Sequence, residues 1–403
     1  MKRNRDFLFL MVGQSLSNVG DVLYVVAVIS FIFEITKSAA ASAIVPFTIT
    51  FAMFISSILT PILIGRVNLK KLLVGSQIGK TVILFGLSAF MMSGLALTNY
   101  YFVFFMIAGI ALLDGCANPI RQTLIPYYVE KEHLIKANGI VETITQSIQI
   151  GTWFFGSLLL IVFSPNQLIL VVALLFVLSS FILALLKNVN HKAERQERMR
   201  DLITQGWQTI RVTPVLKTLA KMEFMETVAN SVWIAAILIV YVKQALNTQE
   251  QWWGFINSAF FIGLVLGSLL CVKFPRFLER NQYRFITVGI VLNCFFTILF
   301  SLTSVPLVAL LLSALIGVFG QLKNIPQQTI IQTSIPKEQL ATVYTSFGTI
   351  STGTFGVGSL IMGLISDYLG VRSVFAISGG LLAVVFVIVV KDRRILKGST
   401  QRG

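Results

Sequence analysis

Charged side chains are scarce in this chain. Only 12% of its 403 residues are Asp, Glu, Lys or Arg, against about 25% in an ordinary soluble protein. By contrast, 55% of the residues are hydrophobic and the mean hydropathy is +0.82. So few charges could not cover the apolar surface of a water-soluble domain, and lipid must take the place of water over most of it.

Cysteine and histidine are also scarce. The three cysteines, Cys116, Cys271 and Cys294, lie in or at the ends of apolar segments and show no metal-ligand spacing. The two histidines, His133 and His191, fall in expected inner loops. Since no nucleophile–base pair or ligand cluster stands outside the apolar runs, we predict no catalytic residue, no metal site, no cofactor and no enzymatic activity.

Long apolar runs fill the rest of the sequence. Each is long enough for a membrane-spanning helix, which needs about 20 residues. The chain therefore predicts an all-α integral membrane fold with twelve transmembrane helices. The runs lie near 7–33, 40–64, 72–96, 100–120, 138–163, 167–187, 217–245, 251–274, 284–304, 306–325, 338–365 and 370–390.

The positive charges follow a pattern along the chain. Lys and Arg number 32 against 17 Asp and Glu, and they return at every second loop. Loops expected to face inward carry, among others, Arg66, Lys70, Lys71, Arg276, Arg280, Arg284 and Lys323, whereas the outward loops hold only Lys37, Lys243 and Arg372. This positive-inside bias predicts that both termini are cytoplasmic. It disfavours nucleic-acid binding, which would gather charge on one face.

One long hydrophilic stretch, 188–216, divides the chain. In it Met199, Leu202, Ile203, Trp207 and Ile210 fall on one helical face, which predicts an amphipathic helix on the inner membrane surface. We therefore expect an N-terminal six-helix bundle over 1–187, a cytoplasmic linker over 188–216, and a C-terminal six-helix bundle with a cytoplasmic tail over 217–403. A regulatory role for the linker stays open.

The two halves repeat each other. Asn324 and Gln328 follow Asn118 and Gln122 by 206 residues, and neighbouring residues match at the same offset. A second match pairs the Gly-rich segment 151–158 with 353–360. Six spans separate the copies, which predicts two parallel six-helix repeats about an axis along the membrane normal.

Several segments carry a family resemblance. They include 13–17 with Gly20-Asp21, Asn118-Pro119-Ile120-Arg121, and 335–338. They resemble the major facilitator superfamily, specifically its twelve-span drug:proton antiporter branch of the macrolide-efflux type. The resemblance implies a multi-pass plasma-membrane transporter of bacterial origin, a monomer whose partners are protons, lipid and a small-molecule substrate.

The function that the resemblance implies is proton-coupled efflux of small amphipathic molecules, drugs or metabolites, as in multidrug resistance. Two departures keep an alternative open. Gly65 stands where the family has a loop acid, and Gly151-Thr152 replaces its Gly-Pro in span five. Uptake or lipid translocation by the same fold is the alternative.

Ionisable side chains inside the spans are the candidates for function, because each costs at least ~2.5–3.5 kcal/mol at the helix centre. Asp21 and Glu142 are the predicted proton-coupling residues. Asp21 has no basic residue within a helical turn in the sequence, so burial would favour its protonated form. A helix-packing hydrogen bond is the alternative role for either carboxyl.

Other polar residues are candidates for the substrate cavity or a gate. Asp114 and Arg121 are seven residues apart on one helical face and could form a gate-side ion pair. Lys80 is expected to extend to the interface, as are Glu223 and Glu226. The pairs Asn118/Gln122 and Asn324/Gln328 would form an inner gate or only cap their helices. The complete set of cavity or gate candidates is Gln14, Asp114, Asn118, Arg121, Gln122, Glu223, Glu226, Trp233, Asn324 and Gln328.

Overall fold

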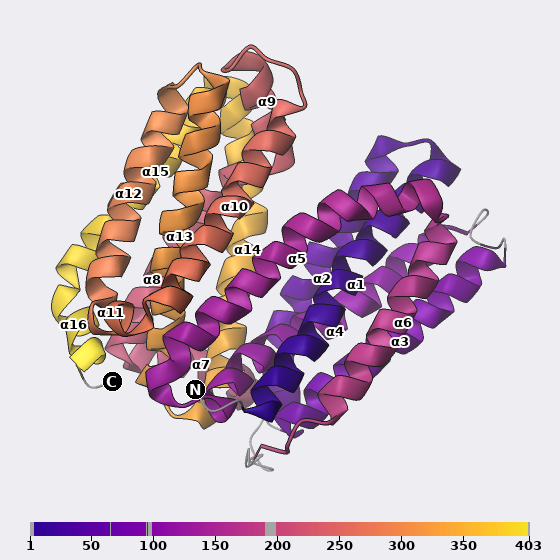
Figure 1. The fold of residues 1–403 in the computed structure, drawn as a ribbon, viewed down its shortest axis with the longest axis horizontal. Coiled ribbons are helices and arrows are strands. Elements are labelled where there is room, and N and C mark those ends of the chain that lie inside the picture. The colour runs from indigo at the N-terminus through magenta and orange to yellow at the C-terminus, as the bar shows by residue number, and fades with distance from the viewer. Residues whose placement is uncertain (1–3, 65, 94, 96–98, 190–198, 402–403) are drawn as a thin grey trace. The chain divides into compact units, whose positions relative to one another are not determined.

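The computed structural model describes residues 4–64, 66–93, 95, 99–189 and 199–401, and every regular element in these ranges is a helix (Figure 1). The helices of the first half are α1 (Arg5–Thr36), α2 (Ala39–Ile64), α3 (Leu69–Met92), α4 (Tyr101–Tyr128), the short turn η2 (Lys131–His133), α5 (Leu134–Val162) and α6 (Pro165–Ala184). Those that follow are α7 (Met199–Val212), α8 (Pro214–Asn230), η3 (Ser231–Trp233), α9 (Ala235–Gln244), α10 (Trp252–Lys273), α11 (Pro275–Arg280), α12 (Gln282–Leu302), α13 (Pro306–Ser334), α14 (Lys337–Leu369), α15 (Val371–Lys391) and α16 (Arg393–Gln401).

The apolar runs become the long helices. Ten helices in the described ranges are long and apolar enough to cross a membrane, and α8 with α9, bent by 55°, would make an eleventh. The 29-residue α5 occupies the position of the predicted fifth span. The prediction of an all-α integral membrane fold is confirmed.

Helix packing repeats between the two halves. In the first half α1 packs on α6, α2 on α4, and α3 on both α4 and α6. In the second half the helices six spans later make the same pairs: α8 with α15, α10 with α13, and α12 with both α13 and α15. The 206-residue offset also links the helix ends, since α4 ends at Tyr128 and α13 at Ser334. The predicted parallel repeat is therefore present in the fold.

The chain divides into two compact units. Unit 1 comprises residues 1–129, 148–206 and 337–348, and unit 2 comprises 130–147, 207–336 and 349–403. Helices α5 and α14 each contribute one part to each unit. The division into 1–187, 188–216 and 217–403 follows the sequence repeat and stays a prediction.

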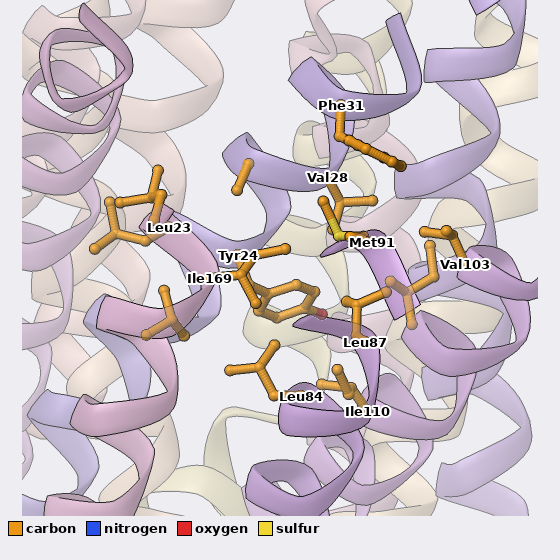
Figure 2. Close-up of a cluster of buried hydrophobic side chains, with 14 of the residues drawn as sticks. Leu23, Tyr24, Val28, Phe31, Leu84, Leu87, Met91, Val103, Ile110 and Ile169 are labelled. Carbon is orange, nitrogen blue, oxygen red and sulfur yellow. The ribbon is translucent and has the colours of Figure 1, made fainter. Parts of the chain in front are cut away.

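Buried side chains from α1, α3, α4 and α6 form the apolar core of unit 1 (Figure 2). Tyr24 and Val28 of α1 lie there with Leu87 of α3 and Ile110 of α4. A glycine is required beside this core, because a Cβ atom at Gly20 would lie 2.5 Å from the ring of Phe176 in α6. The close contact between α1 and α6 depends on that missing side chain.

Aromatic rings form the core of unit 2. The ring centres of Tyr241, Phe300 and Phe375 lie 4.5 to 5.0 Å apart. The buried hydroxyl of Tyr241 donates to the carbonyl oxygen of Phe300. These contacts fix α9, the second part of the interrupted seventh span, against α12 and α15.

The linker contains the expected amphipathic helix from Met199 onward, as α7. Leu202 and Ile210 are buried and Trp207 is exposed. Residues 190–198 of the predicted linker lie outside the described ranges. The short helices α11 and α16 were not among the predicted elements.

Candidate functional site

A lysine and two aspartates form a buried ion-pair cluster in unit 1. The Nζ atom of Lys80 in α3 lies 2.6 Å from Oδ1 of Asp21 in α1 and 2.8 Å from Oδ1 of Asp114 in α4. The lysine side chain is 0% exposed, and the aspartate side chains are 20% and 23% exposed. We call these three residues the unit 1 charge cluster.

Polar neighbours complete the coordination of the ammonium group. Lys80 donates to the hydroxyl oxygen of Ser17 at 3.3 Å, which gives its three N–H groups three oxygen partners. The Ser17 hydroxyl in turn lies 3.2 Å from Oδ2 of Asp21 and 2.9 Å from Oε1 of Gln77. The ring centre of Phe176 lies 4.8 Å from the same ammonium.

Helical spacing explains how the cluster assembles. Ser17 and Asp21 are one turn apart on α1, and Gln77 and Lys80 are one turn apart on α3, so each helix presents a polar stripe. Since α3 packs against α4, Asp114 reaches the same ammonium from the other side. Three charged positions in three apolar helices thus meet at one point.

Two charge states of this cluster differ by one proton. With all three groups ionised it carries a net charge of −1, which is unfavourable inside a bilayer. One proton on either aspartate makes the cluster neutral. The geometry can therefore hold a proton in one state of the protein and release it in another.

Three predictions for these residues are wrong. Lys80 does not extend to the interface. Its side chain is buried, because its position on α3 faces the carboxylates of Asp21 and Asp114 on the neighbouring helices. Asp21 is not isolated from positive charge, since Lys80 comes from another helix. The structure pairs Asp114 with Lys80 instead of Arg121.

Arg121 lies among amide side chains. It donates to Asn118 Oδ1 at 2.8 Å and approaches Asn18 Oδ1 at 3.5 Å. Gln14, one turn before Asn18, donates to the same oxygen at 3.0 Å. The predicted residues Gln14 and Arg121 thus meet through Asn18, a residue that the sequence analysis did not single out.

The repeat-related amides have matching environments in their own units. Asn118 in α4 and Asn324 in α13 are both exposed, and Gln122 and Gln328 one turn later are both half-buried. Their assignment to an inner gate stays a prediction.

Unit 2 contains a cavity of about 240 Å³ that brings three of the predicted residues together. Glu142 from α5 lines it with Asn324 and Gln328 from α13. The other lining residues are Gln146, Phe260, Leu264, Gln321 and Ile325. The cavity is therefore lined by one carboxylate and four carboxamides together with three apolar side chains.

Two amides hold the Glu142 carboxylate in place. Gln146, one turn later on α5, and the buried Gln321 of α13 each donate to its Oε2 at 3.2 Å. Neither glutamine was predicted as a site residue. Helical spacing is the available signal, because Gln146 is four residues from Glu142 and Gln321 three from Asn324.

A second ion pair lies in the interior of unit 2. The Lys323 ammonium of α13 contacts Oε2 of Glu226 in α8, and their side chains are 4% and 6% exposed. Lys323 was predicted in an inward loop and Glu226 at the interface, and both predictions are wrong. The repeat offered a signal for Lys323, since the 206-residue offset aligns it with Ala117 inside α4.

Trp233 belongs to the aromatic core. Its ring centre lies 5.0 Å from that of Phe300, 5.2 Å from Phe375 and 5.9 Å from Phe260. It is only half-buried, and of these three partners only Phe260 also lines the cavity. Within the described ranges, no group of three or more His, Cys, Asp or Glu side chains is placed to hold a metal ion.

Comparison with known sequences gives matches over almost the whole chain. The family model of the Major Facilitator Superfamily matches residues 10–350 and 222–401. An uncharacterised MFS-type transporter of Bacillus subtilis (strain 168), YjbB, is 27% identical over 394 residues, covering 98% of this chain and 96% of the relative. A second from the same organism, YfmI, is 27% identical over 387 residues, covering 94% and 95%.

Solved structures with the same fold span several kinds of transporter. A structure of the MFS transporter FucP, the E. coli fucose:proton symporter, in its outward conformation has a TM-score of 0.77 at 16% identity, covering 95% of this chain and 97% of that one. The human organic anion transporter MFSD10 also has a TM-score of 0.77, at 10% identity and coverage of 96% and 100%. A bacterial homologue of the iron transporter ferroportin gives 0.77 at 13% identity, covering 96% and 98%. Identities this low show the fold alone.

Proposed function

This chain belongs to the Major Facilitator Superfamily, and from that membership we propose that it is a proton-coupled secondary transporter that exports small amphipathic molecules across the bacterial plasma membrane. The observation that carries the proposal is the unit 1 charge cluster, in which Lys80 is held by both Asp21 and Asp114. A lysine and one aspartate would suffice for a neutral structural pair. The second aspartate adds one negative charge, and a proton is the smallest ion that can neutralise it.

In this proposal the cluster alternates between two states. When a proton binds to one aspartate, the lysine keeps the other as its partner and the cluster is neutral. When the proton leaves, the ammonium bridges both carboxylates, as the structure shows. Because the bridge ties α3 to both α1 and α4, protonation loosens one of these two connections and thereby couples to helix movement.

The cavity in unit 2 supports an amphipathic substrate. Phe260, Leu264 and Ile325 supply apolar contact area, while Glu142 and its neighbouring amides can accept and donate hydrogen bonds. A molecule with one polar or cationic end and one apolar end would satisfy both kinds of lining residue.

Import is the second candidate direction. It is supported by the similarity in fold to FucP, a fucose:proton symporter. The same proton site can drive either direction, depending on whether proton and substrate bind together or in turn. We propose efflux as the direction of transport. The proposal also includes cytoplasmic positions for both termini, a monomeric protein, and a division of the chain at residues 187 and 217.

Transport in everted membrane vesicles tests the function. Vesicles from a strain that overproduces the protein are energised, and the pH gradient is followed with an acridine dye while ethidium, tetraphenylphosphonium or a macrolide is added. We expect at least one probe to dissipate part of the gradient. Asp21→Asn and Asp114→Asn each leave a neutral lysine–aspartate pair and should abolish this response while the protein still inserts in the membrane.

The matched control is Glu250→Gln, which removes a carboxylate from an exposed lysine pair, 2.9 Å from Lys243. It should pump as the parent does. The coupling role is wrong if both aspartate variants exchange protons for the probe at the parental rate. A response found only in right-side-out vesicles would overturn efflux and assign import.

A further inference from the structure

A second set of charges in unit 2 has the same composition as the first. Glu223 and Glu226 lie one turn apart on α8, and Lys323 of α13 forms an ion pair with Glu226. Gln327, one turn after the lysine, lies 3.4 Å from the other carboxylate oxygen of Glu226. We call Glu223, Glu226 and Lys323 the unit 2 charge cluster, and nothing in the function proposed above makes use of it.

The repeat relates the two clusters in position but not in detail. Glu226 follows Asp21 by 205 residues, within one residue of the 206-residue repeat offset, so the first helix of each half carries an acid at a nearly equivalent sequence position. The lysine, however, comes from the third span in unit 1 and from the fourth span of the repeat, α13, in unit 2. Different residues thus produce the same balance of two carboxylates and one ammonium.

The two glutamates differ in their surroundings. Glu226 is buried and holds Lys323, whereas Glu223 is half-buried and its side-chain contacts are hydroxyls, from Ser351 and Thr227. Hydroxyl groups can donate to a carboxylate or accept from a carboxylic acid. Glu223 is therefore the more exposed of the two carboxyls, and its hydroxyl partners are compatible with either charge state.

Other charges on the neighbouring elements do not neutralise the cluster. The helices α13, α15 and α16 pack against α8, and α14 approaches it as well, since a Cβ atom at Gly358 would lie 3.6 Å from Cα of Val228. The charged residues of α14 are Lys337, Glu338 and Asp367, near its two ends. Arg372 of α15 donates to backbone oxygens of Ser301 and Leu302, and Asp392 accepts from Thr218, eight residues before Glu226 and about 12 Å away along the helix. The other basic residues of these helices are Lys391 at the end of α15 and Arg393, Arg394 and Lys397 in α16, and α8 itself carries Lys217 and Lys221, which are both exposed. With all three members ionised, the cluster keeps a net charge of −1.

We propose that Glu223, Glu226 and Lys323 form a second proton site, so that the transporter binds up to two protons, one in each charge cluster. The inference rests on the proton coupling proposed above. The Glu223 carboxylate accepts the proton from water and becomes a neutral carboxylic acid, while the Glu226–Lys323 pair stays intact. Release returns the proton to water and restores the charge of −1.

Infrared difference spectroscopy tests this without a substrate. The full chain is reconstituted in lipid nanodiscs and titrated with acid, and the carbonyl band of protonated carboxyl groups in a non-aqueous environment is integrated. Of the band area that the two charge clusters contribute, we expect Glu223→Gln to remove about half. The double variant Asp21→Asn/Asp114→Asn should remove the other half of that contribution, and the exposed control Glu250→Gln should remove none.

Removal of the lysine distinguishes a proton site from an ion pair that only stabilises the fold. Lys323→Met removes the positive charge near Glu223 and Glu226, so the carbonyl band of the protonated glutamates should appear at higher pH. If the ion pair only stabilises the fold, the variant should change stability and leave the band unchanged. The proposal is overturned if Glu223→Gln and Glu226→Gln both leave the band at its parental area. Loss of band area in the glutamate variants but not in the aspartate variants would instead contradict the unit 1 assignment on which the proposed function depends.

Discussion

The side chains of Asn138 in α5 and Gln332 in α13 exchange two hydrogen bonds in the interior of unit 2. The Asn138 amide donates to Gln332 Oε1 at 2.8 Å and accepts from Gln332 Nε2 at 3.3 Å. The same amide nitrogen also lies 3.0 Å from the hydroxyl of Thr329. All three residues are buried. The first turns of α5 are thereby fixed to the C-terminal end of α13, which we propose to be its cytoplasmic end.

Replacement of Asn138 by alanine should lower the free energy of unfolding by about 1–3 kcal/mol, because the partners on α13 lose their hydrogen bonds while staying buried. Thermal unfolding of the purified protein in detergent measures the loss. Asn324→Ala on the same helix is the control, since Asn324 is exposed and its removal should change stability by no more than about 0.5 kcal/mol. Equal effects of the two variants would contradict a structural role for the Asn138 amide.

Removal of Lys80 alone should be more harmful than removal of the whole unit 1 charge cluster. Lys80→Met leaves two like charges facing each other inside the bundle, and breaking a buried ion pair in this way costs about 3–5 kcal/mol. In Lys80→Met/Asp21→Asn/Asp114→Asn no charge remains, so most of this stability should return. Unfolding in detergent and the yield of folded protein report the difference. A triple variant no more stable than the single one would argue against charge imbalance as the cause.

Two glycines of α10 should respond oppositely to alanine. A Cβ atom at Gly263 would lie 2.0 Å from the carbonyl oxygen of Ala314 in α13, whereas no atom lies within 4 Å of one at Gly254. Gly263→Ala should therefore cost about 1–3 kcal/mol through overpacking. Gly254→Ala should stabilise by about 0.5–1 kcal/mol, the usual gain in a helix interior. Melting temperatures compare the pair directly, and a neutral Gly263→Ala would show that α10 and α13 can separate at no cost.

The pH dependence of stability should have a contribution from Glu279 in the loop helix α11. Burial, together with the nearby Glu132, raises the pKa of Glu279 above its ordinary value. The folded state therefore binds this proton more tightly than the unfolded state, and stability falls as the pH rises through the raised pKa. In Glu279→Gln the stability should not fall over this pH range, and at acidic pH it should equal that of the parent protein. Unfolding midpoints across the acidic range show the difference, and parallel curves would refute it.

The proposed orientation predicts which side of the membrane a loop faces. Gln249, in the exposed turn before α10, should be outside, and Asn188, after α6, should be inside. A cysteine at position 249 should react with a membrane-impermeant maleimide in intact cells, and one at position 188 only after the cells are opened. The native Cys116 and Cys271 are buried, and Cys294 is replaced by serine in the parent. The reverse labelling pattern would invert the topology.

The sequence alone determined the helices, their order and the repeat. In lipid every backbone polar group must be satisfied within the structure, so each long apolar run can only become a helix. The ends of α2, α6, α10 and α15 accordingly fall within a few residues of the predicted runs. The match between 118–134 and 324–340 likewise predicted which helices occupy equivalent positions.

Only the tertiary structure decided the partners of the buried charges. Lys80 lies 59 residues from Asp21 and 34 from Asp114 along the chain, and hydropathy carries no information about which faces of α1, α3 and α4 meet. The same holds for Lys323, which the charge count placed in a loop because α13 extends past the end of its apolar run to Ser334. Hydropathy thus determines that a segment lies in the membrane. Lateral packing determines which charges pair there, because only a closely placed and hydrogen-bonded partner offsets the cost of removing a charge from water.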